Sequence, residues 1–317
     1  MPTTNNSKTF QQGSALISAL FIITLVAIAA TAMSMRIQLD IYRTRLTSPS
    51  DKLYLASEAV LFWAMGEISK KKISVLPPNS DGTLLVFPKT SQNLSPNLLT
   101  TGNLYDIQGR FNLNNLTVKE YFPFFIKLLE NVLPDVNAKE REKIAIATRQ
   151  WITPYTPGRG NDEFVSYYTQ QKPPYYPAQD RMQNVSEFRL IRGVNAKIYQ
   201  TLSPYITVLP EVTPININSA SKLMLMSLGN GLTESQVSEI IRLRDTKGIK
   251  DISDLFKNIK ELNIRSKQIT VESKYFLSIA KVTGDDQSLL NYSIIERAKD
   301  NEGNITVSLV SESLNSP

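Results

Sequence analysis

The residue types most often used for catalysis are missing from this chain. Its 317 residues contain no histidine and no cysteine. Ser-His and Cys-His catalysis, imidazole and thiolate metal sites, and disulfide bonds are therefore excluded. The formal net charge of +6 permits contact with anionic surfaces without requiring it. We therefore do not expect an enzyme.

One stretch has residues that could bind phosphate groups through the backbone. Gly229 and Gly231 stand between two predicted helices, and residues 215–256 resemble a helix-hairpin-helix module. In the DNA-binding modules of this class, hairpin N–H groups bind phosphates with help from cations. The nearby cations are Arg242, Arg244 and Lys247. The acids that offset them are Glu234, Glu239 and Asp245. Because a phosphate-binding surface needs a clearer basic stripe, a helical packing unit is favoured and nucleic acid is not expected as a partner.

The longest apolar stretch begins near the N-terminus. No charged residue occurs from Ser14 to Met35. About 20 mostly apolar residues in a helix span a bilayer core, so residues 14–35 are predicted to be a transmembrane helix.

The sequence before this helix indicates how it is processed. Residues 1–13 are polar, end in glycine and lead directly into the apolar run, whereas a signal peptide has its cleavage site after the apolar core. The arrangement resembles a prepilin leader. The resemblance implies that a prepilin peptidase cuts between Gly13 and Ser14 and that Ser14 is then N-methylated. Ser18 stands where pilins usually have the glutamate that pairs with the amine of the subunit above, which suits a subunit at the tip of a filament.

The charges beside the predicted span and the prepilin resemblance imply opposite membrane topologies. Lys8 precedes the predicted span, and four basic residues follow it closely: Arg36, Arg43, Arg45 and Lys52. The positive-inside rule would keep the C-terminal side in the cytoplasm. The prepilin resemblance implies a single-pass protein of the bacterial inner membrane with its C-terminal domain in the periplasm, and we follow the resemblance.

A stem helix is predicted to continue over residues 36–72. Pro49 is expected to interrupt or kink it, with Ser48 capping a restarted helix. Short apolar runs bounded by turn residues then predict strands at 84–87 and 104–107. Three further strands are predicted at 275–281, 292–298 and 305–310.

Two similar motifs stand in the middle of the chain. Residues 109–116 and 214–221 each contain Asn-apolar-Asn before a predicted helix. Helices are predicted at 124–133 and 144–151 after the first motif, and at 219–228 and 237–244 after the second. Asn137 and Thr233 have the spacing of capping residues. The repetition predicts two small helical subdomains, 117–213 and 214–268.

Combined in order, these motifs make the chain similar to a known family. The shared features are Gly109-Arg-Phe-Asn-Leu-Asn-Asn-Leu116, Trp151, Tyr167-Tyr168, Pro173-Pro174-Tyr175, Ser186-Glu-Phe-Arg-Leu190, Ile215-Asn-Ile-Asn-Ser-Ala220 and Tyr275-Phe-Leu-Ser-Ile-Ala280. They resemble the type II secretion minor pseudopilins of the general secretion pathway protein K family.

The resemblance implies an α+β fold, with a pilin-like N-terminal helix on an antiparallel sheet (73–116 and 269–317) and a helical insert at 117–268. It implies a subunit at the tip of the type II secretion pseudopilus that supports secretion across the outer membrane of a Gram-negative bacterium. Implied partners are the minor pseudopilins I and J, other pseudopilins, the prepilin peptidase and the inner membrane. The alternative is a membrane-anchored DNA-binding protein of competence type, which would use the hairpin at Gly229 and Gly231.

The resemblance also implies calcium, but the chain departs from the family pattern. Thr153 and Tyr155 stand where the family commonly has acids after the tryptophan. Asp162 and Glu163 remain in a glycine-rich loop, and calcium needs six to eight oxygen ligands. Calcium binding there is possible, and the other interpretation is two solvated loop acids. Tyr175 and Tyr176 are likewise interpreted either as a docking surface or as packing across an irregular loop.

Overall fold

The computed structural model describes residues 12–70, 82–91, 97–156, 158, 162–259, 262, 264–284, 287–300 and 302–316. Within them the side chains of residues 12–14, 45–49, 162, 247 and 258 are not described. The chain divides into two compact units, Met1–Leu53 and Tyr54–Pro317. The boundaries predicted for a leader, a span, a stem, a sheet domain and a helical insert remain predictions.

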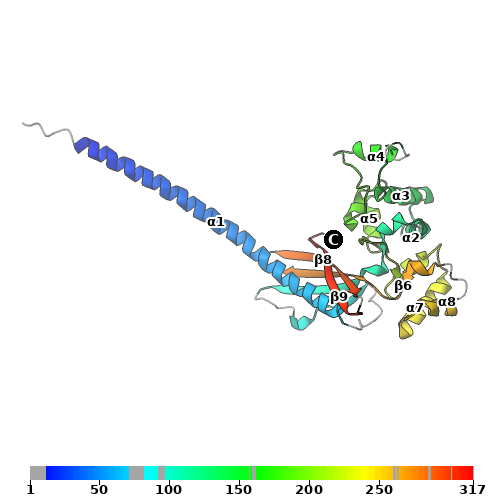
Figure 1. Ribbon diagram of the computed structural model, residues 1–317. Coiled ribbons are helices and arrows are strands. Elements are labelled where there is room, and N and C mark those ends of the chain that lie inside the picture. The colour runs from blue at the N-terminus through cyan, green and yellow to red at the C-terminus, as the bar shows by residue number, and fades with distance from the viewer. Residues whose placement is uncertain are drawn as a thin grey trace, which may run out of the picture. The chain divides into compact units, whose positions relative to one another are not determined.

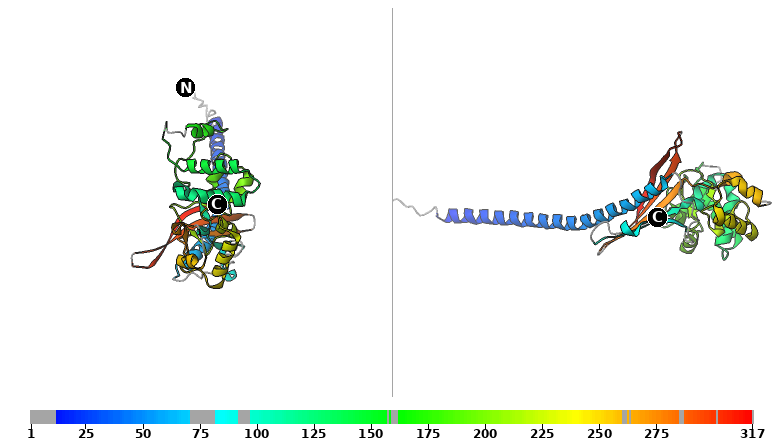
Figure 2. Two further views of the ribbon diagram at one scale, coloured as in Figure 1. Left: turned by 90° about the vertical axis from the view of Figure 1, so that its right-hand side faces the viewer. Right: turned by 90° about the horizontal axis from the view of Figure 1, so that it is seen from below.

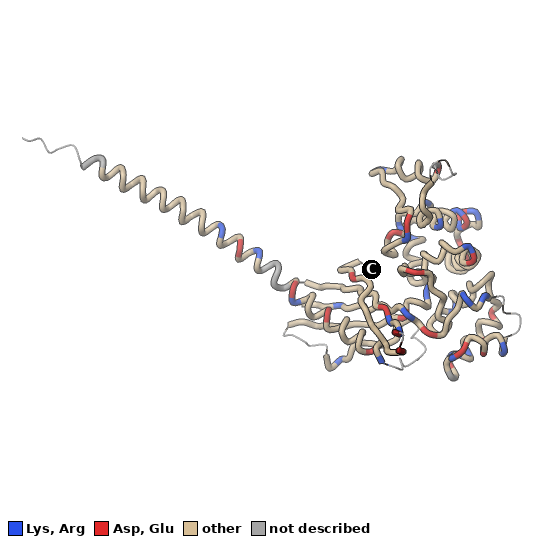
Figure 3. The backbone as a smooth tube through the Cα atoms, in the orientation of Figure 1, with Lys and Arg blue, Asp and Glu red and all other residues tan. Residues whose placement is uncertain are grey.

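Helix α1 (Gln12–Ile68) is 57 residues long and passes through both units. Its segment Ala15–Thr44 is long and apolar enough to cross a membrane, and its side chains are exposed. Figure 3 shows the first part of α1 without charged residues. A spanning helix needs this composition because lipid offers no partner for a charge.

The interruption predicted at Pro49 is wrong, because α1 is continuous from Gln12 to Ile68 and Ser48 therefore caps no second helix. The alternative, a kink at Pro49, stays a prediction. A proline in a helix interior removes one backbone donor and costs roughly 3 kcal/mol. The apolar segment before it and the buried residues after it, among them Val60 and Ala64, favour a helix on both sides. We attribute the continuity to these flanking segments.

Unit Tyr54–Pro317 contains a five-stranded antiparallel sheet in the order β1-β2-β7-β8-β9. Its strands are β1 (Thr83–Val86), β2 (Leu99–Asp106), β7 (Tyr275–Thr283), β8 (Ser288–Lys299) and β9 (Ile305–Leu314). All five predicted strands are confirmed; β1 is shifted by one residue, and the other four are longer than predicted. The hairpin of β8 and β9, orange to red in Figure 2, projects at one end of the sheet.

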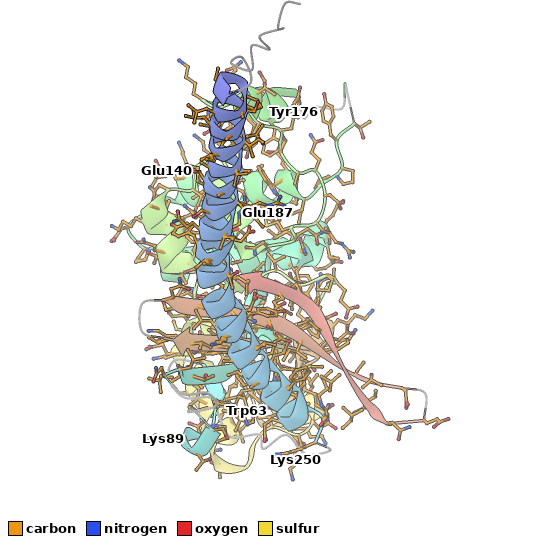
Figure 4. The ribbon with its side chains drawn as sticks, turned by 90° about the vertical axis from the view of Figure 1, so that its left-hand side faces the viewer. Trp63, Lys89, Glu140, Tyr176, Glu187 and Lys250 are labelled. Carbon is orange, nitrogen blue, oxygen red and sulfur yellow. The ribbon has the colours of Figure 1, made fainter. Side chains whose placement is uncertain are left out.

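The last turns of α1 pack on one face of this sheet. Val60 lies over Gly102 of β2, where a Cβ atom would be 2.3 Å from Val60 Cγ1. One buried cluster joins the helix to the strands; its members are Leu61, Ala64, Ile68, Leu104, Phe276 and Ile295. Trp63, labelled in Figure 4, packs edge-on against Phe87 with ring centroids 5.5 Å apart. The stem and the sheet therefore share one core.

Neighbouring strands β2 and β7 are joined by a long, mostly helical segment, green to yellow in Figure 1. Its helices are α2 (Phe122–Val132), α3 (Ala138–Trp151), α4 (Asp162–Thr169), α5 (Ala196–Leu202), α6 (Lys222–Ser227), α7 (Glu234–Lys247) and α8 (Ile252–Asn258). Its short strands are β3 (Phe111–Asn112), β4 (Ile206–Thr207), β5 (Ile215–Asn216) and β6 (Ile269–Thr270). Short 3-10 helices in this segment are Ile107–Gly109, Leu113–Thr117, Lys119–Tyr121, Val185–Leu190 and Ser266–Gln268, and a further one, Lys89–Ser91, lies between β1 and β2.

The predicted helix starts of this segment are largely confirmed. Asn137 caps α3, and Thr233 forms a reciprocal capping box with Gln236 at α7. Helix α2 begins earlier than expected, with Pro123 in its first turn, because the missing N–H of a proline is unpaired there in any case. One buried apolar cluster includes residues of both predicted subdomains, from Phe111 to Ile269.

Candidate functional site

The predicted cleavage junction lies at the start of α1. Gly13 and Ser14 belong to the first helical turn, and residues 1–11 are outside the described part of the chain. A cut between Gly13 and Ser14 would leave almost the whole helix on the mature protein. The cut and the methylation of Ser14 stay predictions.

The stem has a second apolar face that sequence reasoning missed. Leu55 and Phe62 are 68% and 65% exposed, whereas Ala56, Val60 and Ala64 are buried against the sheet. Positions seven apart lie on the same side of a helix. Apolar residues on both sides of 53–68 were the available signal, but the sequence does not say which side meets the sheet. The exposed pair forms a surface against which another apolar helix can pack.

The end of the stem is fastened to the sheet by an arginine. Arg297 of β8 donates from Nε to the Ile68 carbonyl at 2.8 Å and from an Nη atom to the Lys70 carbonyl at 3.3 Å. The last carbonyls of a helix lack intrahelical partners and carry the negative end of its dipole. The Arg297 guanidinium donates hydrogen bonds to these carbonyls and places a positive charge at the negative end of the dipole.

The junction between the sheet and the helical segment is built around Asp106, at the end of β2. Its carboxylate accepts hydrogen bonds from Gln108 N, Asn216 Nδ2 and Ser273 Oγ. Burial raises the pKa of Asp106, and these hydrogen bonds oppose the shift. The carboxylate thereby connects the exit from β2, the second Asn motif and the return into β7.

Lys274 forms two ion pairs beside this junction. Lys274 Nζ is 2.6 Å from Glu211 Oε1 and 2.9 Å from Glu296 Oε1. The Tyr275 hydroxyl donates to Glu211 at 3.0 Å. The hydrogen bond from Lys274 lowers the pKa of Glu211. These contacts attach the segment before β5 to the first residues of β7.

The two Asn motifs have the same role in each half of the helical segment. Asn114 binds both backbone groups of Met182, accepting from N at 2.9 Å and donating to O at 3.0 Å. Asn218 binds Ile249 in the same way, at 3.1 and 2.9 Å. In both halves the motif strand pairs in parallel with a later one, β3 with β4 and β5 with β6. The asparagines therefore hold each half closed.

The hairpin considered for DNA binding uses its backbone internally. Gly229 and Gly231 have positive φ angles of 62° and 101°, as a tight turn requires. Gly231 N donates to Leu228 O and Leu232 N donates to Met226 O, so these two amides are not free for a phosphate. Lys127 also lies over Gly231. The two glycines therefore form the tight turn between α6 and α7.

Two of the three cations near the hairpin, Arg242 and Arg244, are paired with acids. Arg242 forms a two-pronged pair with Glu239, and Arg244 binds Asp245 and the Ala220 carbonyl. The side chain of Lys247 is outside the described part. Blue and red are interleaved along α7 in Figure 3, without a basic stripe. The alternative of a DNA-binding protein is not favoured.

The residues considered for calcium are only partly described. Asp162 begins α4, but its side chain is not described. Glu163 is exposed and lies 3.9 Å from Arg192, while the Thr153 hydroxyl donates to the Arg149 carbonyl. Among the residues that the structure describes, no group of three or more acids is placed to hold a metal. Calcium at Asp162 and Glu163 stays a prediction.

The two neighbouring tyrosines have different environments. Tyr175 packs against Tyr168 with centroids 5.4 Å apart and donates from its hydroxyl to the Leu190 carbonyl. Tyr176 is 77% exposed and is labelled in Figure 4. Packing therefore accounts for Tyr175, but not for Tyr176.

Comparison with known proteins places both halves of the helical segment in one family. Family models described as "Type II secretion system (T2SS), protein K" match residues 109–211 and 215–272, which together are about half of the chain. The matches begin at the two Asn motifs.

Curated relatives match over most of their length. The type II secretion system protein K of Aeromonas hydrophila is 29% identical, covering 92% of this chain and 95% of that protein. The protein of the same name from Pseudomonas aeruginosa is 26% identical, with 92% and 90% covered. A putative protein K of Escherichia coli K12 is 25% identical, with 88% and 91% covered.

A solved structure has the same fold. A chain in the crystal structure of the GspK-GspI-GspJ complex from the enterotoxigenic Escherichia coli type 2 secretion system superposes with a TM-score of 0.68. The match covers 87% of this chain and 100% of that chain, at 22% sequence identity.

Proposed function

The chain belongs to the type II secretion system protein K family, and we propose that it ends the pseudopilus as a membrane-anchored tip subunit. It is a minor pseudopilin of the secretion machinery. The stem helix would hold the protein in the inner membrane before assembly and pack among other stems afterwards.

The observation that carries the tip position is the connection between β2 and β7. These strands are hydrogen-bonded neighbours, yet the chain between them forms seven described helices with a large core of their own. A segment of this bulk would collide with a subunit stacked in register above it. Ser18 stands where pilins usually have the glutamate that pairs with an upper subunit, and this also supports a position at the tip.

The proposed partners are the minor pseudopilins I and J. The related GspK chain was solved together with GspI and GspJ. The exposed face of the stem at Leu55 and Phe62 suits the helix of such a partner, because removing large apolar side chains from water stabilises association. Other pseudopilins would contact the same helix further down the filament.

The proposed location is the inner membrane, crossed once at residues 14–35, with the C-terminal part in the periplasm. Prepilin peptidase would release residues 1–13. Intact mass of the membrane-extracted protein tests this directly: a chain starting at Ser14, with or without a methyl group, supports it, and a chain starting at Met1 or Pro2 removes the pilin-type pathway.

We infer a structural role without catalysis. The sequence has no histidine or cysteine, and the buried polar groups at Asp106 and the Asn motifs are engaged in structural hydrogen bonds. The role therefore rests on shape and contacts.

The tip position is tested by varying dosage. At a fixed supply of the other pseudopilins, more of this chain is expected to give shorter or fewer pseudopili by electron microscopy, because each copy ends a filament. An antibody label on the chain is expected at one filament end. Longer pseudopili, or label along the shaft, would overturn the proposal.

A further inference from the structure

Two glutamates from distant parts of the chain meet where the stem lies beside the edge strand of the sheet. Glu312 of β9 accepts a hydrogen bond from Asn291 Nδ2 at 2.6 Å and another from the Tyr54 hydroxyl at 3.1 Å. Both oxygens of Glu312 therefore receive a donor, which is the environment of an ionised carboxylate.

The environment of Glu58 on α1 is different. Its Oε1 atom is buried and has no hydrogen-bond partner. The same turn of α1 is bound to the surroundings of Glu312: Tyr54, one turn before Glu58, donates to Glu312, and Ser57 accepts from Asn291, which also binds Glu312. Residues four apart on a helix share a face, so the Glu58 carboxyl group is on the side of α1 that meets Glu312. Two carboxylates cannot bond to each other, since both only accept; a proton on one of them turns it into a donor. Because Glu312 is already supplied with two donors, the proton belongs on Glu58.

Among the described residues, no positively charged group is bound to either carboxyl group. The titratable groups that face Glu58 are Tyr54 on the same helix and Glu312 on β9. Strand β8 contributes the neutral amide of Asn291 and the hydroxyl of Ser293. In the part of the chain that the structure describes, no lysine or arginine forms an ion pair with either carboxyl group.

We propose that Glu58 and Glu312 share one proton, so that a carboxylic acid–carboxylate pair joins the stem helix to the edge strand and weakens when that proton leaves. The proton forms an O–H···O⁻ hydrogen bond, which is short and strong. Loss of the proton to solvent leaves two negative charges side by side. This property does not depend on the tip position proposed above.

Stability is expected to fall as pH rises through the titration of the pair. Burial, and then the charge of Glu312, raises the pKa of Glu58 above its ordinary value of 4.5, and a hydrogen bond from the Tyr54 hydroxyl opposes this rise. The folded state therefore binds more protons than the unfolded state between 4.5 and the raised pKa. The stability that the shared proton contributes is fully present below pH 4.5 and is lost as the pH rises above the raised pKa of Glu58.

The first experiment measures thermal unfolding of the full chain in detergent micelles between about pH 4 and pH 8, for the wild type and Glu58→Gln. Glutamine has the same shape and donates permanently to Glu312. We expect the Tm of the variant to fall less steeply with rising pH than the Tm of the wild type. At the highest pH tested, the variant should unfold at a higher temperature than the wild type. Asp51→Asn, which removes an exposed acid of the same helix, is the matched control and is expected to keep the wild-type slope.

The second experiment observes the proton without unfolding. Infrared spectra of protein with isotope-labelled glutamate carboxyl groups are expected to show a protonated carboxyl band that persists above the ordinary glutamate pKa. Glu58→Gln should remove the band and Asp51→Asn should keep it. Parallel Tm–pH curves for wild type and Glu58→Gln, or a band unchanged by that substitution, would overturn the proposal.

Discussion

Arg297 of β8 donates its Nε proton to the carbonyl of Ile68, the last residue of α1, at 2.8 Å. The two residues are far apart in the sequence, and the bond fixes the C-terminal end of the stem to the sheet. The same guanidinium reaches the Lys70 carbonyl. The strand thus caps the helix that packs across it.

Replacing Arg297 by methionine is expected to lower the free energy of unfolding by roughly 1–3 kcal/mol, because the carbonyls lose a charged donor while the apolar stem of the side chain is largely kept. Chemical denaturation of the full chain in detergent measures the change. Arg297→Lys is the matched control and should recover part of the loss, since lysine keeps the charge but not the planar fork. Equal losses in both variants would contradict the capping role.

Gly109 is expected to tolerate no side chain. A Cβ atom there would lie 2.7 Å from the backbone carbon and oxygen of Ser219. Gly109→Ala should therefore destabilise by about 1–3 kcal/mol or more, because the backbone of the second Asn motif must move.

Gly66 is the matched control for this substitution. It lies in α1, is exposed, and has nothing within 4 Å of an added Cβ. Gly66→Ala should stabilise by about 0.5–1 kcal/mol through helix propensity. A Gly109→Ala variant as stable as Gly66→Ala would refute the close approach of the two motifs.

The contact between Val60 and Gly102 predicts a coupled pair of substitutions. Gly102→Ala places a methyl group against Val60 Cγ1, and Val60→Ala leaves a small cavity between the stem and β2. In the double variant, the methyl group that Gly102→Ala adds occupies part of the space that the Val60 side chain leaves. We expect the double variant to lose less stability than the sum of the singles, by about 0.5–3 kcal/mol. Strict additivity in denaturation experiments would mean that the helix does not lie over Gly102.

Much of the fold was predictable because it depends on local signals. Alternating apolar residues bounded by turns located the five sheet strands, and the spacing of Asn137 and Thr233 located two helix starts. The interruption predicted at Pro49 was wrong because a local rule about proline was outweighed by the helix-favouring segments on both sides.

The contacts that hold the elements together could not be predicted in this way. Asn114 binds Met182, and Asp106 binds Ser273, across long stretches of sequence. Nothing in the identity of one residue indicates the other. Likewise, the sequence identified 53–68 as an apolar helix but could not divide its residues between the buried and the exposed face.

The exposed face of the stem gives the last prediction, which concerns assembly. Phe62→Glu should leave the Tm of the isolated chain within a few degrees of the wild type, since Phe62 is exposed, and should reduce secretion and co-purification with the partner pseudopilins. The expected loss arises because a charge must be buried when a neighbouring apolar helix packs there.

Val86→Glu is the matched control for this substitution. Val86 is also a large exposed apolar residue, at 58%, but it lies on β1 at the other edge of the sheet from β9. Secretion and partner recovery should be unaffected in that variant. If both substitutions reduce secretion equally, general surface disturbance explains the loss. If neither does, the Leu55–Phe62 face is not where the partner helix packs, because an unpaired glutamate in the centre of a helix–helix contact could not be accommodated without a measurable cost in assembly.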